Sequence, residues 1–339
     1  MARTPTLNEI LEGNVPLTRN REMLADLARQ RESRVLALVL ARGVTLRTGF
    51  IPPLLEVLET LPEGGSLDLY IDTFGGASEE AWRIVSMLRE RFDRYTAIIP
   101  FAATPGATQI ALGADDLMMG EASSLAPIEP ARLKAVRDDD GENRSMTAYD
   151  VQHYLQFVQR ALGVERLAVD SPLWSALVDR VDPMIIGITE KAHQINRLVT
   201  RRCLETHFDP EKDRSRIDAI LDEVGAGTLG RRFPITRRDC ERRLGLQVIK
   251  PAREIWQAVW ALDTYFRQML DIEGDLQLGE TQHYTVGFDG FIDTVDERRV
   301  LLRITRVDEH GRPIADKPVL HRWVSPKGRE VVLDEELEL

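Results

Sequence analysis

"YIDTFGGASEEAWRIVSMLRER", residues 70–91, is the stretch that decides the fold. It starts inside the apolar run "LDLYI" (67–71), passes through a glycine pair, and continues with the periodicity of a helix. One helix face collects the apolar residues at three- and four-residue spacing, at Ala81, Ile84, Val85, Leu88 and Phe92. The stretch therefore predicts a buried strand, a tight turn and an amphipathic helix.

The same alternation of strands and helices extends to both sides. Residues 35–40, 96–100 and 116–120 are short apolar runs typical of buried strands, and residues 107–114 have the composition of a small-residue helix. Such alternation predicts an α/β fold with a mainly parallel sheet and flanking helices. From about Gln282, short alternating runs separated by turn residues predict hairpins, and hence a small β-rich C-terminal appendage.

Composition excludes several classes of protein. The chain has 339 residues, 43% of them hydrophobic, and a formal net charge of −11, which argues against broad nucleic-acid binding. The two cysteines, Cys203 and Cys240, form no CxxC pair, and the six histidines show no metal-ligand spacing, so no metal and no cofactor are predicted. The chain start has no signal-peptide core and no run is long enough to span a membrane, so we expect a soluble, cytoplasmic protein.

Two polar turns follow neighbouring strands of the predicted sheet. Gly75 and Gly76 come after residues 67–71, and Thr104 sits on the turn between residues 96–100 and the next helix. The carboxyl ends of adjacent parallel strands converge on one crevice, so these turns are expected to face the same site. Glycines let backbone N–H groups point outward to hold an oxyanion, and a hydroxyl on such a turn is a candidate nucleophile. Taken singly, glycine pairs after strands are more often plain turns.

Three stretches carry a resemblance to a known family. They are residues 70–91, 98–130 ("IIPFAATPGATQIALGADDLMMGEASSLAPIEP") and 233–248 ("FPITRRDCERRLGLQV"). They resemble the serine dehydrogenase proteinase family, a relative of signal-peptide peptidase A and Clp protease in the ClpP/crotonase superfamily. The resemblance runs from about residue 20 to residue 272 and implies a homo-oligomer.

A division of the chain follows from this extent. We expect an N-terminal helical segment at residues 1–34, a ClpP/crotonase-like domain of the serine dehydrogenase proteinase type at 35–272, and the β-rich appendage at 273–339.

The resemblance also implies roles for individual residues. Thr104 takes the position of the family's nucleophilic serine, and Lys191 lies on the stretch similar to the lysine-bearing helix of the signal-peptide-peptidase branch. Gly75, Gly76 and Gly106 would supply the oxyanion hole and contact substrate. Lys191 lies beside an apolar stripe, so it is expected to be partly buried with a lowered pKa, although a lysine extending from a core helix into solvent fits equally. The stripe consists of Ile188, Ala192, Ile195 and Val199.

The chain departs from the family pattern at three points. An internal threonine is a more crowded nucleophile than serine. Pro105, directly after it, has no N–H to donate to an oxyanion and disfavours helical backbone angles at Thr104. Arg231 and Arg232 stand where the family has a histidine and an acid; they could grip an anionic ligand or form a solvated pair.

Three functions remain open. The first is a pseudoprotease, scaffold or peptide-binding subunit, because serine, oxyanion donor and histidine–acid pair are lost together. The second is an active peptidase with a Thr104/Lys191 dyad. The third is a crotonase-type binder of acyl ligands, in which Gly75 and Gly76 hold a thioester carbonyl. A peptide or a protein is the expected partner of the first.

Overall fold

The centre of the protein is a mixed sheet of nine described strands in the order β10-β5-β3-β2-β1-β12-β13-β14, with β11 paired to β12. The computed structural model describes residues 19–128, 133–137, 143–146, 148–163, 172, 183–225, 233–271, 273–278, 282–308, 310–315 and 317–325. The strands of the sheet are β1 (Arg34–Leu40), β2 (Ser66–Asp72), β3 (Arg94–Ile99), β5 (Asp116–Met119), β10 (Val248–Ile249), β11 (Glu273–Leu278), β12 (Gln282–Asp293), β13 (Arg298–Val307) and β14 (Leu320–Val324).

One half of the sheet is parallel. Strands β1, β2, β3, β5 and β10 pair in parallel, and four of them coincide with the apolar runs that predict strands. The predicted α/β class with a parallel sheet and flanking helices is confirmed for this part. Parallel pairing places the carboxyl ends of β2 and β3 at the same edge, where their following turns meet.

The C-terminal strands extend this sheet. β12 pairs antiparallel with β1, in a register that runs from Ala37 opposite Asp293 to Leu40 opposite Gly290. A side chain at Gly290 would meet the Val39 carbonyl oxygen at 3.0 Å, so glycine permits this close approach. The strands predicted as an appendage instead cover the edge of β1, which would otherwise expose unpaired backbone groups. The domain boundary at residue 272 stays a prediction.

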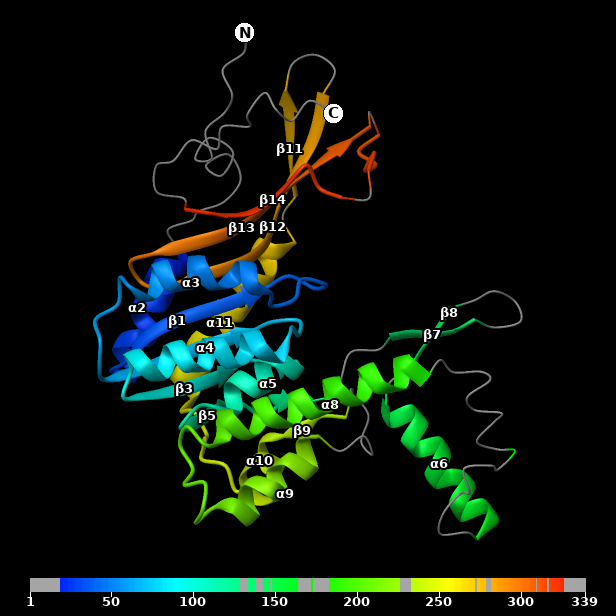
Figure 1. The fold of residues 1–339 in the computed structure, drawn as a ribbon. Helices are drawn as coiled ribbons and strands as arrows, with labels where there is room; N and C mark the ends of the chain where they lie inside the picture. Colours follow the sequence, from blue (N-terminus) through cyan, green and yellow to red (C-terminus); the bar gives the residue numbers. More distant parts are fainter. Residues whose placement is uncertain are drawn as a thin grey trace.

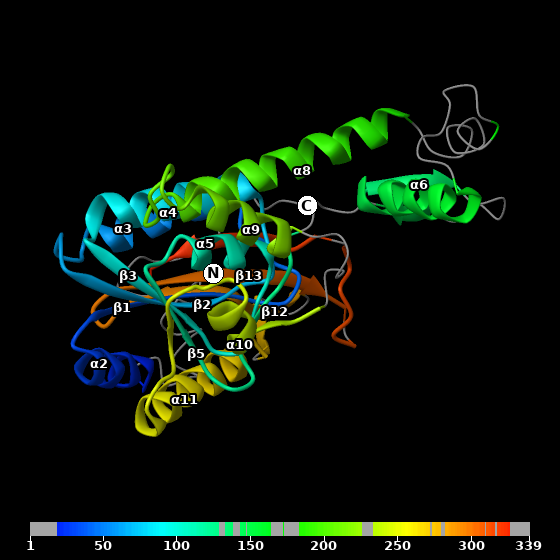
Figure 2. The same ribbon diagram turned by 90° about the horizontal axis from the view of Figure 1, so that it is seen from below.

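Helices cover both faces of the sheet. Figure 2 shows α3, α4, α8 and α9 on one side and α2 and α11 on the other. α5 packs against α4 and α8. The helices are α2 (Arg19–Arg31), α3 (Ile51–Leu58), α4 (Ser78–Arg91), α5 (Pro105–Leu112), α6 (Ala148–Leu162), α8 (Pro183–Leu204), α9 (Arg214–Val224), α10 (Arg237–Arg242) and α11 (Arg253–Leu270), with the 3₁₀ turn η1 at Thr48–Phe50.

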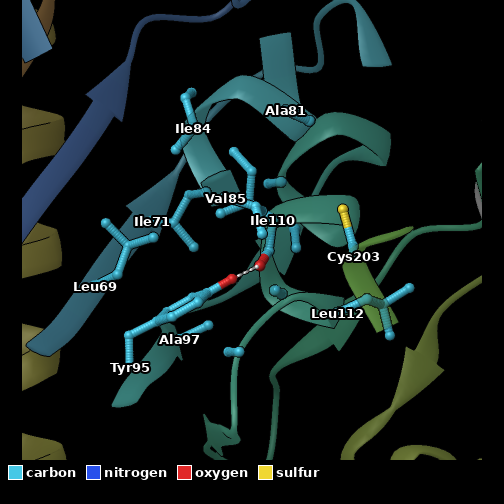
Figure 3. Packing of buried hydrophobic residues seen from close by; sticks show 14 of the residues in the cluster. Leu69, Ile71, Ala81, Ile84, Val85, Tyr95, Ala97, Ile110, Leu112 and Cys203 are labelled. Atoms are coloured by element: carbon cyan, nitrogen blue, oxygen red, sulfur yellow. Dashed lines mark hydrogen bonds between the residues drawn. The ribbon is translucent and has the colours of Figure 1, made fainter. Parts of the chain in front are cut away.

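The two helix layers enclose two hydrophobic clusters. Leu36, Leu38 and Leu40 of β1 face one cluster, whereas Val35, Ala37 and Val39 face the other. Because both faces of the strand are buried, its sequence is a continuous apolar run. Figure 3 shows the first cluster between α4 and α5, where the Tyr95 hydroxyl donates to the Ile110 carbonyl at 2.7 Å.

A second, three-stranded sheet joins segments that are far apart in the sequence. β4 (Ala102–Ala103) pairs with β6 (Ser124–Leu125), and β6 pairs with β9 (Ile235–Thr236). This sheet places the stretch around residues 233–248 next to the turn that carries Thr104. A separate hairpin is formed by β7 (Leu133–Arg137) and β8 (Asn143–Met146).

Only part of α8 packs on the sheet layer. Figures 1 and 2 show its N-terminal part extending beyond the sheet, beside α6. Ile188 near that end is 52% exposed, whereas Val199 near the other end is 6% exposed. The predicted apolar stripe of α8 is therefore buried only toward its C-terminal end.

Candidate active site

Thr104 occupies the first position before helix α5. It is the N-cap residue, with φ −77° and ψ 170°, and Pro105 is the first helical residue. Proline is tolerated there because the first N–H groups of a helix have no partner inside the helix. The extended backbone at Thr104 agrees with the restriction that a following proline imposes.

The Thr104 hydroxyl has two backbone partners. It donates to the Thr73 carbonyl at 2.5 Å and accepts from the Gly75 N–H at 2.5 Å. The hydroxyl proton therefore points at a carbonyl oxygen, which is too weakly basic to remove it. The Gly75 N–H, expected to hold an oxyanion, is occupied by the hydroxyl.

The glycine pair is held in place by the segment before η1. Gly75 and Gly76 have φ of +85° and +153°. The Leu46 N–H donates to the Gly75 carbonyl at 3.0 Å, and the Ala77 N–H donates to the Leu46 carbonyl at 3.3 Å. A Cβ added at Gly76 would lie 2.4 Å from the Leu46 Cβ and 2.8 Å from its backbone N and O. Glycine is therefore required at Gly76 for both backbone angle and space.

Gly106 packs directly against the glycine pair. A Cβ added at Gly106 would lie 3.3 Å from the Gly76 nitrogen and 3.4 Å from the Gly75 carbonyl carbon. The structure thus brings Thr104, Gly75, Gly76 and Gly106 together. Their roles in an oxyanion hole stay predictions.

Lys191 does not share this cluster. Its side chain is exposed on α8, so the expectation that it is partly buried is wrong. α8 meets α4 and α5 through Asn196, whose side-chain carbonyl accepts from Ser78 Oγ at 2.6 Å and whose backbone carbonyl accepts from Gln109 Nε2 at 3.3 Å. Five residues along a helix turn the side chain by about 140°, so Lys191 faces away from the side on which Asn196 lies. In the part of the chain that the structure describes, only backbone groups bond the Thr104 hydroxyl.

Two further predicted residues are not placed. Arg231 and Arg232, the candidate ligand-gripping pair, lie outside the described residues.

Thr104 lies on the wall of a cavity of about 800 Å³. The turns after β1, β2 and β3 form one side, whereas the end of α11 and strands β12 and β13 form the other. The lining residues are Leu40, Ala41, Arg42, Gly43, Val44, Asp72, Thr73, Phe74, Phe101, Ala102, Thr104, Arg267, Leu270, Asp271, Asp289 and Arg303. The C-terminal strands therefore contribute to the site, which no sequence pattern predicts.

The electrostatics of the cavity centre on two carboxyl groups. Asp263 is 1% exposed; it accepts from the Tyr70 hydroxyl at 3.1 Å and from Arg267 Nε at 2.7 Å. Asp72 forms no hydrogen bond or ion pair with any described residue. Burial raises the pKa of Asp72 to about 6, the negative charge of Asp263 raises it further, and Arg267 opposes this shift.

Sequence reasoning missed Asp72, Arg267, Asp289 and Arg303. Asp72 directly follows the last apolar residue of β2, so its place at the strand end was available as a signal. Arg267 lies on α11, and Asp289 and Arg303 lie on β12 and β13. No local pattern reveals that these elements meet the turns after β1, β2 and β3.

The described ranges contain neither a candidate metal site nor a candidate membrane-spanning helix. No group of three or more His, Cys, Asp or Glu side chains there could hold a metal ion. None of the helices in those ranges combines the length and apolar character that crossing a membrane requires.

The part of the chain that carries the Thr104 turn and the glycine pair matches a known family model. Residues 9–136 match the family model of ClpP-like SDH-type serine proteinases. The match confirms the resemblance over two of the three stretches that carry it, residues 70–91 and 98–130.

Similar proteins cover only part of the chain. Two uncharacterized proteins of Methanocaldococcus jannaschii are 30% and 28% identical to it over 117 and 112 residues. These matches cover 32% and 33% of the chain and 40% and 38% of the relatives, so the chain spans about two fifths of their length. A solved structure of a membrane-bound stomatin-specific protease is similar over 39% of the chain and 63% of that protease, with 14% identity and a TM-score of 0.26.

Proposed function

We propose that the chain is a degenerate ClpP-like protease that binds a peptide or a protein partner without cleaving it, acting as a pseudoprotease, scaffold or peptide-binding subunit. The observation that carries this proposal is the closed pair of hydrogen bonds at Thr104, to the Thr73 carbonyl and from the Gly75 N–H.

These hydrogen bonds work against catalysis at two steps. Nucleophilic attack needs a base that takes the hydroxyl proton, but the proton of Thr104 is directed to a carbonyl. The tetrahedral intermediate then needs N–H donors, but the Gly75 N–H is already bonded. Both bonds would have to break before Thr104 could react.

Pro105 removes a further donor. In related sites the residue after the nucleophile supplies an N–H to the oxyanion, and a proline cannot. The loss of one such donor lowers the rate by roughly a hundred- to a thousandfold. The position of Pro105 at the first turn of α5 shows that the helix tolerates the change without cost to its own hydrogen bonds.

The competing function is an active peptidase. It is favoured by one observation: Thr104 is only half-buried and lines a cavity large enough for a peptide segment. This function requires a base beside Thr104, and the exposed Lys191 on α8 would have to turn toward the cavity to serve as one.

A covalent probe separates the two functions. We expect fluorophosphonate and β-lactone probes to leave the wild-type chain unlabelled, and fluorescent peptides to bind it without being cleaved. Labelling of the wild-type chain that disappears in Thr104→Ala and persists in the control Thr264→Ala would show an active nucleophile and refute the proposal. Thr264 is exposed, with its hydroxyl bonded to a carbonyl of its own helix.

A gain-of-function variant tests the scaffold itself. Thr104→Ser combined with Pro105→Gly restores a serine and an N–H at the two changed positions. Peptide cleavage by this double variant would show that the missing groups, and not the fold, cause the lack of activity. Binding of an acyl-CoA measured by calorimetry would instead favour the acyl-ligand function.

The assembly and location of the protein are part of the same proposal. We expect a homo-oligomer in the cytoplasm with no nucleic-acid partner. Sedimentation at micromolar concentration tests the first point, and a monomer would contradict it.

A further inference from the structure

Asp72 is a charged group that the proposed mechanism does not use. It is the last residue of β2, its side chain is half-buried, and it lines the cavity that also contains Thr104. Within the described part of the chain its carboxyl group has neither a hydrogen bond nor an ion pair.

The two groups that could donate to Asp72 bond another carboxylate. The Tyr70 hydroxyl and the Arg267 guanidinium both donate to Asp263, at 3.1 Å and 2.7 Å. A half-buried carboxylate without a partner is unfavourable, because burial removes water that nothing replaces. Its pKa of about 6 means that it is mostly ionised at neutral pH, so the cavity wall holds a negative charge that no described side chain contacts directly.

The remaining charges of the cavity nearly balance. Arg303 donates to Asp289 at 3.1 Å, and this carboxylate is also 2.9 Å from His321 Nε2. The lining contains three guanidinium groups and three carboxylates, and Asp263 stands directly behind Arg267. Carboxylates therefore outnumber guanidinium groups by one. The lining residues in this balance are Arg42, Arg267, Arg303, Asp72, Asp271 and Asp289.

Two aromatic rings open onto the same cavity. Phe74 is 41% exposed and Phe101 is 46% exposed, which is unusual for rings of this size. The Arg267 guanidinium already lies 5.6 Å from the centre of the Phe101 ring. These rings offer apolar contact area and a π-face beside the unpaired carboxylate.

We propose that Asp72 is the anchor of a subsite for a primary ammonium group attached to an apolar group, as at the N-terminus of a peptide whose first side chain is apolar. The ammonium donates to Asp72, and the apolar group packs on Phe74 and Phe101. This inference rests on the proposed peptide-binding function, but its test does not require a peptide.

The test compares two probes of the same shape, 2-phenylethylamine and 2-phenylethanol, by calorimetric titration of the full chain. We expect the amine to bind at least about tenfold more tightly at pH 7.5, since a hydrogen bond between charged groups is worth this much. We also expect its affinity to fall as the pH is lowered through 6, the pKa of Asp72, while the alcohol shows no such change.

Variants assign the effect to one residue. Asp72→Asn should bind the amine about tenfold more weakly and leave the alcohol within about twofold of wild type. Asp271→Asn removes an exposed carboxylate at the rim of the same cavity and should weaken the amine by less than about twofold, because water screens it. A thermal melt establishes that each variant is folded.

Three outcomes would overturn the proposal. The first is equal affinity for the amine and the alcohol, and the second is an unchanged amine affinity in folded Asp72→Asn. The third is an equal loss of amine affinity in Asp72→Asn and Asp271→Asn, because this would show a general electrostatic attraction and no specific contact. Failure of the peptide-binding function is distinguishable: the amine would still bind through Asp72, but peptides with a free N-terminus would not. If peptides bind equally with free and acetylated N-termini, only the subsite is wrong.

Discussion

Replacing Thr104 by valine tests the hydrogen bonds on which the proposed function depends. Valine has the shape of threonine, so Thr104→Val removes the hydroxyl and leaves the Thr73 carbonyl and the Gly75 N–H without this partner. Each lost bond lowers the free energy of unfolding by roughly 0.5–1.5 kcal/mol, so the variant should lose about 1–3 kcal/mol. Thr104→Ser keeps both bonds and should lose less than about 1 kcal/mol.

The neighbouring threonine supplies a matched control. The Thr73 hydroxyl is buried and has no partner among the described residues. Thr73→Val is the same chemical change one strand end away, and it should leave stability unchanged or raise it, because no hydrogen bond is lost. The measurement is urea-induced unfolding at equilibrium, followed by tryptophan fluorescence and by circular dichroism.

The sign of the change in unfolding free energy for Thr104→Val distinguishes a satisfied hydroxyl from an unsatisfied one. Residues kept for catalysis often reduce stability, and their replacement then stabilises the protein. An increase in the unfolding free energy of Thr104→Val would mean that its hydroxyl is not satisfied by the backbone. The premise of the proposed function, that two backbone groups satisfy the Thr104 hydroxyl, would then be refuted.

Three further perturbations have effects fixed by the structure. Asp72→Asn should raise the free energy of unfolding by about 1–3 kcal/mol at pH 7.5 and leave it unchanged well below pH 4. The pKa of Asp72 is about 6 in the folded protein against the ordinary 3.8, so the protonated carboxyl group favours folding at low pH. This contribution to stability is lost as the pH rises through 6. Arg298→Met should cost about 3–5 kcal/mol in urea unfolding, because it leaves the fully buried Asp293 without the guanidinium that donates to it at 2.8 Å. Gly76→Ala should cost at least about 2 kcal/mol and reduce peptide binding, because its Cβ overlaps Leu46.

Two of these predictions have a control variant, and the third is checked by its dependence on pH. Arg21→Met breaks an ion pair to Asp296 of similar length, 3.0 Å, whose side chains are 63% and 74% exposed, and should cost less than about 1 kcal/mol. Gly43→Ala has φ +90° but no atom within 4 Å, so only backbone strain of about 1–2 kcal/mol is expected. Equal losses for Gly43→Ala and Gly76→Ala, or for the two arginine variants, would contradict the arguments from packing and burial. A stability difference for Asp72→Asn that does not change with pH would contradict the argument from titration.

Local patterns were sufficient for the parallel half of the protein. The apolar spacing from Ala81 to Leu88 predicts α4, and Pro105 after Thr104 predicts a strand–turn–helix with an extended residue at the turn. These features depend on neighbours in sequence, so the sequence alone contains the necessary information. The predicted meeting of Thr104 with Gly75 follows from parallel pairing of neighbouring strands.

Non-local packing explains what was not predicted. The stripe beside Lys191 predicts a buried face, but how far α8 extends beyond the sheet depends on the position of its packing partners, which periodicity does not contain. In the same way, alternating residues in β12 predict a strand but do not specify β1 as its neighbour. Asp72 could have been noticed at the end of β2; its lack of a partner depends on Tyr70 and Arg267 both bonding Asp263.

The cavity wall formed by α11, β12 and β13 lies outside the part of the chain that matches the family model. The family match ends at residue 136, yet Arg267, Asp289 and Arg303 close the far side of the cavity. Proteins that match only residues 9–136 can therefore share the turns after β2 and β3 and still bind different molecules. A ligand known for one such protein can be assigned to another only after their C-terminal strands have been compared.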